Sequence, residues 1–223
     1  MKLVHEDLNC AIMSNESLFT EWIIESPDYF SKFLDELWKQ CENGTGHYVL
    51  SDNEKELDIR KNVELIFQPF AIDLNDKRIL GKLYVELEQL AHSEQFFVRT
   101  QEITQYILEY VLELEHRTDY ILQTENDLDL TMILKSLSVK CEIMEESYLE
   151  KLVQYIKITS QLLKKKLYVF VNIRSYLTDE KMNLLIKEMM YQEIHILFIE
   201  NQERSCLEGG IRYIIDADGC EIQ

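Results

Sequence analysis

The sequence predicts an α/β protein with a mostly parallel sheet in a head of degenerate nucleotide-binding-like topology, and an inserted helical arm. Two runs, 167–171 and 194–199, are rich in β-formers and apolar on both faces, which is typical of strands in a covered parallel sheet. A helical pattern separates them, so the segment is expected to form a right-handed β-α-β unit. A third observation, leucines recurring every three or four residues from Leu80 onward, predicts the arm.

The helix of this unit should begin near Thr178. A threonine can accept a hydrogen bond from the first turn, and Asp179 and Glu180 suit the positive end of a helix. Leu177 and Met182 are spaced to form a hydrophobic staple.

The remaining elements of the head follow from shorter patterns. Leu149, Leu152, Ile156 and Leu163 predict an amphipathic helix, and Pro27 should open another over 28–41. Strand candidates are 18–24, 47–50, 137–143 and 211–215. We therefore assign 1–60 and 137–223 to the head and 61–136 to the arm.

The arm should contain two long helices. One carries its apolar stripe at Leu80, Leu83, Leu87 and Leu90, and the second at Ile103, Ile107, Tyr110 and Leu114, after a break near His92. Two such helices joined by a short polar turn predict an antiparallel pair that buries both stripes.

Composition restricts the class of protein. The start of the chain lacks the apolar core of a signal peptide, and no apolar run has the roughly 18 residues of a membrane helix. Five cysteines without a CxxC indicate buried reduced thiols and a cytoplasmic protein, and no paired Cys or His at short spacing suggests zinc. The net charge of −18 taken alone disfavours nucleic acid.

No recognisable catalytic constellation is present, so we predict binding and assembly rather than enzymatic activity. Gly44-Thr45-Gly46 lacks the following Gly-Lys-Ser/Thr of a phosphate loop, and Asn172 follows a strand where an NTPase would usually offer an acid for Mg²⁺. The acid-rich segments 179–181 and 216–219 are better explained as a helix start and a turn than as a nuclease motif or a calcium loop.

Charge is distributed unevenly along the chain. Residues 82–129 contain 11 acidic and 3 basic residues, whereas 130–190 contain 7 acidic and 10 basic. The acidic stretch could be a solvated surface, or could bind a hard cation such as Ca²⁺; Glu115 and Asp119 would share a helical face. The basic set could be solvated helix ends, or a phosphate-binding face if copies converge by symmetry: Lys135, Lys140, Lys164, Lys165, Lys166 and Arg174.

Several segments resemble a known family. The run Met132-Ile133-Leu134-Lys135-Ser136-Leu137-Ser138-Val139-Lys140, then Leu162 to Asn172 and Tyr176-Leu177-Thr178, is similar to the Csn-two family of CRISPR-associated adaptation proteins of subtype II-A. Phe70, Ile72-Asp73, Ile79-Leu80 and Leu87-Glu88 resemble the family's entry into its arm. The resemblance covers about residues 65–200, and the segments before 60 and after Glu200 depart from the family pattern.

This resemblance implies a non-catalytic protein for CRISPR spacer acquisition. It implies a homotetrameric ring, stabilised by Ca²⁺ on acidic arm residues, that holds double-stranded DNA near its ends without sequence preference. It also implies the CRISPR integrase and effector nuclease as partners. By matching position, Lys135, Lys140 and Lys164–Lys166 become DNA candidates, and Glu115, Asp119, Glu125 and Asp127 become metal candidates.

Two rival functions remain open from the sequence. The charge of −18 and the amphipathic arm also fit an acidic protein–protein adaptor of an adaptation complex that does not bind DNA. A degenerate phosphate-loop enzyme is the other, and it would require tight nucleotide binding.

Overall fold

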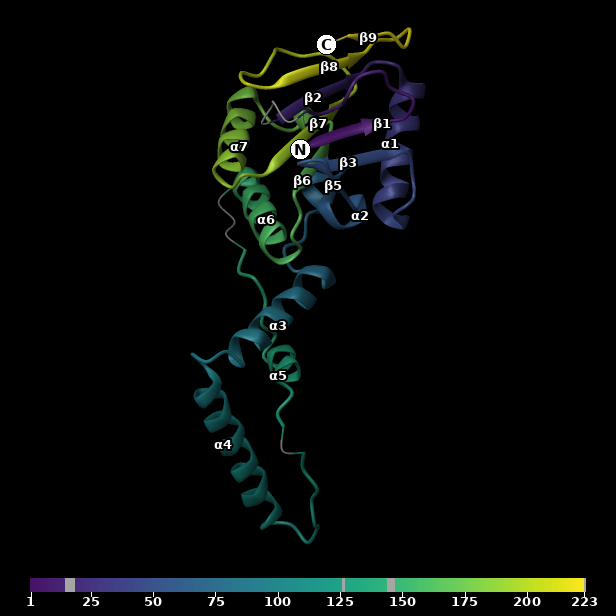
Figure 1. Cartoon of the computed structure of the whole chain (residues 1–223). Coiled ribbons are helices and arrows are strands. Elements are labelled where there is room, and N and C mark those ends of the chain that lie inside the picture. The colour runs from purple at the N-terminus through teal and green to yellow at the C-terminus, as the bar shows by residue number, and fades with distance from the viewer. Residues whose placement is uncertain (15–18, 126, 144–146, 223) are drawn as a thin grey trace. The chain divides into compact units, whose positions relative to one another are not determined.

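A computed structural model of the chain describes residues 1–14, 19–125, 127–143 and 147–222 (Figure 1). The strands are β1 (Lys2–His5), β2 (Phe19–Ile24), β3 (Tyr48–Asp52), β4 (Lys55–Leu57), β5 (Val63–Ile66), β6 (Leu167–Val171), β7 (His195–Glu200), β8 (Ile211–Ile215) and β9 (Glu221–Ile222). The α-helices are α1 (Pro27–Asn43), α2 (Ile59–Asn62), α3 (Lys77–Ala91), α4 (Phe97–Glu115), α5 (Leu130–Ser136), α6 (Tyr148–Leu162) and α7 (Asp179–Tyr191), and 3₁₀ turns cover Pro69–Ala71 and Ile173–Ser175.

The chain divides into two compact units. The sheet unit comprises Met1–Leu74 and Ile143–Gln223, and the helical unit comprises Asn75–Glu142. Strand β5, within the range 61–136 that the sequence assigned to the arm, pairs with β6 in the sheet unit.

The large sheet has the strand order β5-β6-β7-β2-β8-β9. Its first five strands are parallel neighbours, and β9 alone pairs antiparallel, as a hairpin with β8. The predicted α/β class and mostly parallel sheet are therefore confirmed. A second, antiparallel sheet of order β1-β3-β4 was not predicted as a separate sheet.

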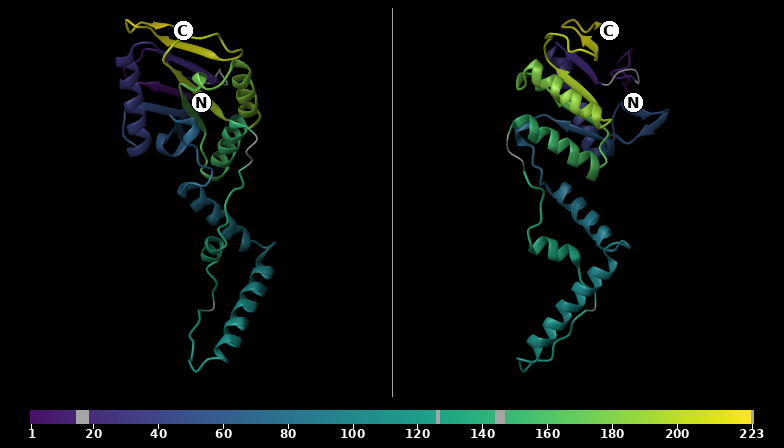
Figure 2. Two further views of the ribbon diagram at one scale, coloured as in Figure 1. Left: turned by 180° about the vertical axis from the view of Figure 1, so that it is seen from behind. Right: turned by 90° about the vertical axis from the view of Figure 1, so that its left-hand side faces the viewer.

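Helices cover both faces of the large sheet, with α1 on one side and α6 and α7 on the other (Figure 2). Strand β6 is buried along its whole length, as a strand between two helical layers must be. Toward α1, Trp22, Val169 and Leu197 join Phe33 and Leu37 in the main core. This burial supplies the main driving force for the fold.

The predicted β-α-β unit is present as β6-α7-β7, and β6 and β7 are adjacent parallel strands. Thr178 caps α7, since its side chain accepts a hydrogen bond from the backbone N–H of Lys181 at 3.4 Å. Met182, Leu185 and Met189 are buried along one face of α7. The local sequence thus determines both the start and the inward face of this helix.

The helical unit differs from the predicted antiparallel pair. Helix α4 leads away from the end of α3 instead of lying along it (Figures 1 and 2), and α3 packs against α5. Only Thr104 of α4 is buried. The prediction was wrong because an apolar stripe specifies that a helix needs a partner but does not specify which one.

Residues 137–143 were wrongly predicted as a strand. They form no strand, and side chains of the helical unit bond the backbone at two of these residues. The Tyr84 hydroxyl donates to the Val139 carbonyl at 2.9 Å, and the Asn75 side chain forms two hydrogen bonds with the Cys141 backbone. Side-chain hydrogen bonds have replaced a strand ladder here.

The described helices include none with both the length and the apolar character required to cross a membrane.

Candidate nucleic-acid interface

The three consecutive lysines form the turn between α6 and β6, and they do not share one environment. Lys164 has a positive φ of 58° and is exposed. The Lys166 side chain is 47% exposed, and its Nζ lies 3.4 Å from Asp52 Oδ2. These two lysines are available to a polyanion, at the C-terminal end of α6.

Lys165 points inward, which corrects its assignment as a DNA contact. Its side chain is 9% exposed, and Nζ donates to the carbonyl oxygens of Arg60 at 2.9 Å and Val63 at 2.6 Å. Its third neighbour is the Glu64 carboxylate at 3.4 Å. Lys165 therefore holds α2 and β5 against the start of β6 and has no exposed charge to offer a phosphate.

The sheet unit supplies two basic residues that the sequence patterns did not single out. Arg60 and Lys61 are exposed on α2, and the backbone of α2 adjoins the lysine turn because Lys166 N donates to the Asn62 carbonyl at 2.8 Å. Arg60, Lys61, Lys164 and Lys166 together are the basic corner of the sheet unit. Residues about 100 positions apart in the chain give no local signal of this grouping.

Lys135 and Lys140 belong to the helical unit. Lys135 lies in the last turn of α5, and Lys140 follows in the extended segment; both are exposed. Their exposure is compatible with phosphate contact.

Arg174 is buried, which corrects its place in the basic set. Its residue exposure is 4%, and NH1 lies 2.6 Å from Glu21 on β2. Its NH2 contacts Asp179 at 2.8 Å, and Arg212 binds the other oxygen of Glu21 at 2.9 Å. The guanidinium balances a carboxylate inside the protein and is not presented to solvent.

Glu200, at the end of β7, adjoins this ionic cluster. It is 1% exposed, one carboxyl oxygen accepts a hydrogen bond from Arg174 N at 3.1 Å, and Oε2 has no partner among the described residues. Burial raises the pKa of Glu200 to about 7, against the opposing effect of the Arg174 backbone hydrogen bond.

We predict that Glu200→Gln removes part of the pH dependence of stability. The folded state holds the Glu200 proton more tightly than the unfolded chain does. This group therefore stabilises the fold fully below its ordinary pKa, and that contribution is lost as pH rises through about 7. The variant should gain about 1–3 kcal/mol relative to wild type at pH 8 and little at pH 4.5, measured by urea denaturation. An equal difference at both pH values would contradict this assignment.

The positions where a nucleotide would bind do not form a phosphate site. Ligands of open parallel sheets bind at the carboxyl ends of the strands, yet β2 and α1 are joined by Glu25 and Ser26 alone. Pro27 then removes one of the backbone N–H groups that a phosphate would use. At the end of β6, Asn172 Oδ1 accepts from Asn201 N at 3.1 Å, so this side chain links two strand ends.

Gly44-Thr45-Gly46 is the predicted turn. Gly44 ends α1 with a φ of 80°, and its N–H donates to the Gln40 carbonyl. Gly46 lies so close to the Gln40 side chain that a Cβ there would meet its Oε1 at 2.5 Å. The glycines are thus required by packing and chain reversal.

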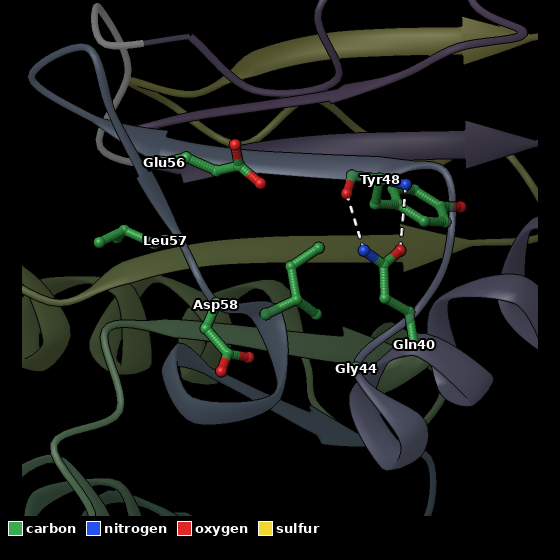
Figure 3. A pocket seen from close by; sticks show the side chains of 7 residues that line it. Gln40, Gly44, Tyr48, Glu56, Leu57 and Asp58 are labelled. Carbon is green, nitrogen blue, oxygen red and sulfur yellow. Dashed lines mark hydrogen bonds between the residues drawn. The ribbon is translucent and has the colours of Figure 1, made fainter.

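A pocket of about 310 Å³ lies beside this turn (Figure 3). Its polar wall is formed by the Gln40 amide, which bonds both the N–H and the carbonyl of Tyr48, and by Glu56 and Asp58. The Asp58 side chain caps α2. These groups are structural or exposed acids, and among the lining residues there is no nucleophile paired with a base.

The acidic residues proposed for calcium lie at the C-terminal end of α4 and in the segment that follows it. Helix α4 ends at Glu115, so Asp119 lies beyond it and the predicted shared helical face is wrong. Glu115 Oε1 accepts from Leu122 N at 3.0 Å, and Asp119, Glu125 and Asp127 are exposed. Within the described chain, no three of these carboxylates bring ligand oxygens within 4.8 Å of one another.

Comparison with known proteins decides the family. The profile described as "CRISPR-associated protein (Cas_Csn2)" matches residues 40–219. The chain belongs to the Cas_Csn2 family. This confirms the resemblance seen in the lysine turn and its flanking segments. The match also extends beyond residue 200, where the sequence had departed from the expected pattern.

Two Cas_Csn2 relatives give the degree of similarity. "CRISPR-associated protein Csn2" of Streptococcus agalactiae is 24% identical over 212 residues, which cover 93% of this chain and 90% of that protein. The Enterococcus faecalis protein of the same name is 26% identical over 148 residues, which cover 65% of this chain and 64% of that protein.

Solved structures with a distant likeness include parts of ABC transporters. An ATP-binding cassette of an ABC transporter in its ADP conformation has a TM-score of 0.45 at 13% identity, covering 92% of this chain and 79% of that one. The structure of cbiO1 of Clostridium perfringens, part of an ABC transporter complex, has a TM-score of 0.42 at 12% identity. The match covers 86% of this chain and 70% of that one.

Proposed function

We propose that this Cas_Csn2 protein takes part in CRISPR spacer acquisition as a calcium-stabilised homotetrameric ring that binds double-stranded DNA without sequence preference and near its ends. It is proposed to act without catalysis, in the cytoplasm, together with the CRISPR integrase and effector nuclease. Family membership supports the pathway. The physical argument for assembly and DNA binding comes from the exposed residues of α4 and of the basic corner.

The unpartnered apolar surface of α4 carries the assembly proposal. Along this helix Val98 is 66% exposed, Tyr106 66% and Tyr110 61%. A helix with one buried residue has too little contact to be stable alone, because helix stability comes mostly from tertiary packing. Large exposed apolar patches mark association surfaces, and homo-oligomers usually close by symmetry.

Assembly would also reconcile the acidic charge with DNA. One basic corner on a chain of net charge −18 is a weak electrostatic site. Four copies facing one opening would multiply the positive potential there, while the exposed carboxylates of the helical unit bind Ca²⁺. Since no three of those carboxylates converge within the described part of one chain, the proposal requires ligands from a second subunit or from water.

We predict that the double change Tyr106→Glu/Tyr110→Glu disrupts the tetramer. Two carboxylates on one exposed face of α4 would have to be desolvated at a subunit contact. Light scattering should give about four times the 26.6 kDa monomer mass for wild type with Ca²⁺ and a smaller mass for the variant. Tyr191→Glu, at a residue 75% exposed on α7, is the matched control. A wild-type monomer under all conditions contradicts the ring.

The alternative is an acidic adaptor that binds proteins of the adaptation complex and not DNA, which the charge of −18 favours. A mobility-shift titration of linear duplex over a salt series separates the two functions. The ring proposal expects binding that weakens steeply with salt, because phosphate contacts release counterions. If the protein fails to bind duplex DNA even at low salt, the result favours the adaptor function.

A further inference from the structure

Two histidines and a glutamate from separate segments of the sheet unit meet at one point. His5 ends β1, Glu36 lies in the middle of α1, and His47 immediately precedes β3. His5 Nε2 lies 2.8 Å from Glu36 Oε2, and His47 Nδ1 lies 3.7 Å from the same oxygen. One ligand atom from each of the three residues falls within 4.8 Å of the others.

A fourth donor is adjacent. Glu6 Oε1 lies 3.2 Å from His47 Nδ1. In a tetrahedral zinc site with metal–ligand distances near 2.0–2.1 Å, neighbouring ligand atoms are about 3.3 Å apart. The separations of 2.8, 3.2 and 3.7 Å in this structure bracket that value.

One wall of the site is rigid and the other is open. The His5 side chain has 0% exposure, and its ring is held edge-on by Phe33 and Tyr48 at centroid distances of 5.1 and 4.5 Å. Glu36 is 25% exposed and His47 56%. An ion can therefore approach from solvent toward a nitrogen whose position is fixed in advance.

We propose that His5, Glu36 and His47 bind Zn²⁺, with Glu6 or water as the fourth ligand. The donor set of two imidazoles and carboxylates suits zinc, whereas calcium prefers oxygen ligands alone. This site is therefore distinct from the calcium proposed for the helical unit. Its ligands would join α1 to β1 and to the α1–β3 turn, at the point where β1 and β3 already pair as His5 opposite Tyr48.

Zinc binding requires one local rearrangement. His5 Nδ1 accepts a hydrogen bond from Asp7 N at 3.2 Å, which places the ring proton on Nε2, where it can be donated to Glu36. A metal at Nε2 requires the other neutral tautomer, with the proton on Nδ1. The Asp7 N–H then gives up a long hydrogen bond, and its neighbour Glu6 is free to turn toward the ion.

The test uses the full chain, freed of metal, and Zn²⁺ titrated against a chromophoric chelator. Wild type should bind one tightly held Zn²⁺ per chain and melt at a higher temperature with zinc than without. Co²⁺ should give the visible absorption of tetrahedral coordination. His47→Ala should weaken Zn²⁺ binding by at least about tenfold, since even changes outside the ligand set cost 10–100-fold. His92→Ala, on an exposed histidine elsewhere, should leave it unchanged.

Two further variants keep the result interpretable. Glu36→Gln can still accept a hydrogen bond from His5 but loses the charged ligand, so it should retain the metal-free melting temperature and lose the zinc-dependent increase. Cys206→Ser/Cys220→Ser removes the two exposed thiols and should bind zinc as wild type does. The proposal is overturned if wild type fails to bind zinc, if His47→Ala binds it equally well, or if the thiol variant loses it.

Discussion

Arg174→Ala is expected to lower the free energy of unfolding by about 3–5 kcal/mol, because it removes one of the two counter-charges of a buried carboxylate. Glu21 is 2% exposed at the centre of the large sheet and contacts Arg174 at 2.6 Å. Arg212 alone would then balance this carboxylate. The substitution also removes hydrogen bonds to Asp179 and to the backbone and side chain of Ser205.

Urea denaturation followed by circular dichroism measures this effect, and Arg99→Ala is the control. Arg99 pairs with Glu102 on α4, and the two side chains are 70% and 50% exposed, so its removal should change stability by less than about 0.5 kcal/mol. A fully stable Arg174→Ala protein that no longer binds DNA would instead return Arg174 to the interface. The experiment thus separates a folding role from a binding role for the same residue.

Reversing charge in the basic corner should have the largest effect on DNA binding. We expect Arg60→Glu/Lys164→Glu to weaken duplex binding by about two orders of magnitude or more at moderate salt, because the change recurs in every subunit and phosphate contacts dominate such affinity. The slope of log affinity against log salt should also fall by about 1 for each phosphate that the variant no longer neutralises. Both side chains are exposed, so folding should be preserved.

Lys181→Glu/Lys187→Glu is the matched control, since it changes the net charge equally at two exposed positions of α7. Fluorescence anisotropy with a labelled linear duplex gives both affinity and salt slope. If the α7 variant loses as much affinity as Arg60→Glu/Lys164→Glu does, DNA binding reflects the overall charge of the protein and not the basic corner. If neither loses affinity, DNA binds elsewhere on the protein, with Lys135 and Lys140 as the next residues to change.

The burial of the cysteines could be predicted only in part from the composition of the chain. The odd number of cysteines and the lack of a CxxC predicted buried reduced thiols. Cys10, Cys41 and Cys141 are partly buried, and burial raises the pKa of Cys41 to about 12. Cys206 and Cys220 are exposed, so the expectation that all five thiols are buried was wrong.

The sequence by itself determined the parts of this protein that depend on neighbours along the chain. Apolar runs identified β6 and β7, Thr178 marked the start of α7, and the turn at Gly44 and the break after α3 followed from local chemistry. The family could also be predicted from the sequence, since the segments that carried the resemblance lie within residues 40–219, which match the family.

Only the tertiary structure decided which charges are used inside and which remain outside. Lys164, Lys165 and Arg174 cannot be told apart by charge in the sequence. In the structure Lys164 is exposed, whereas Lys165 pairs with buried Glu64 of β5 and Arg174 with buried Glu21 of β2. Likewise, no spacing in the sequence relates His5 to His47, which the pairing of β1 with β3 brings together. Burial and counter-charge are properties of packed surfaces, and residues far apart in the chain acquire them only when the sheet and helices have assembled.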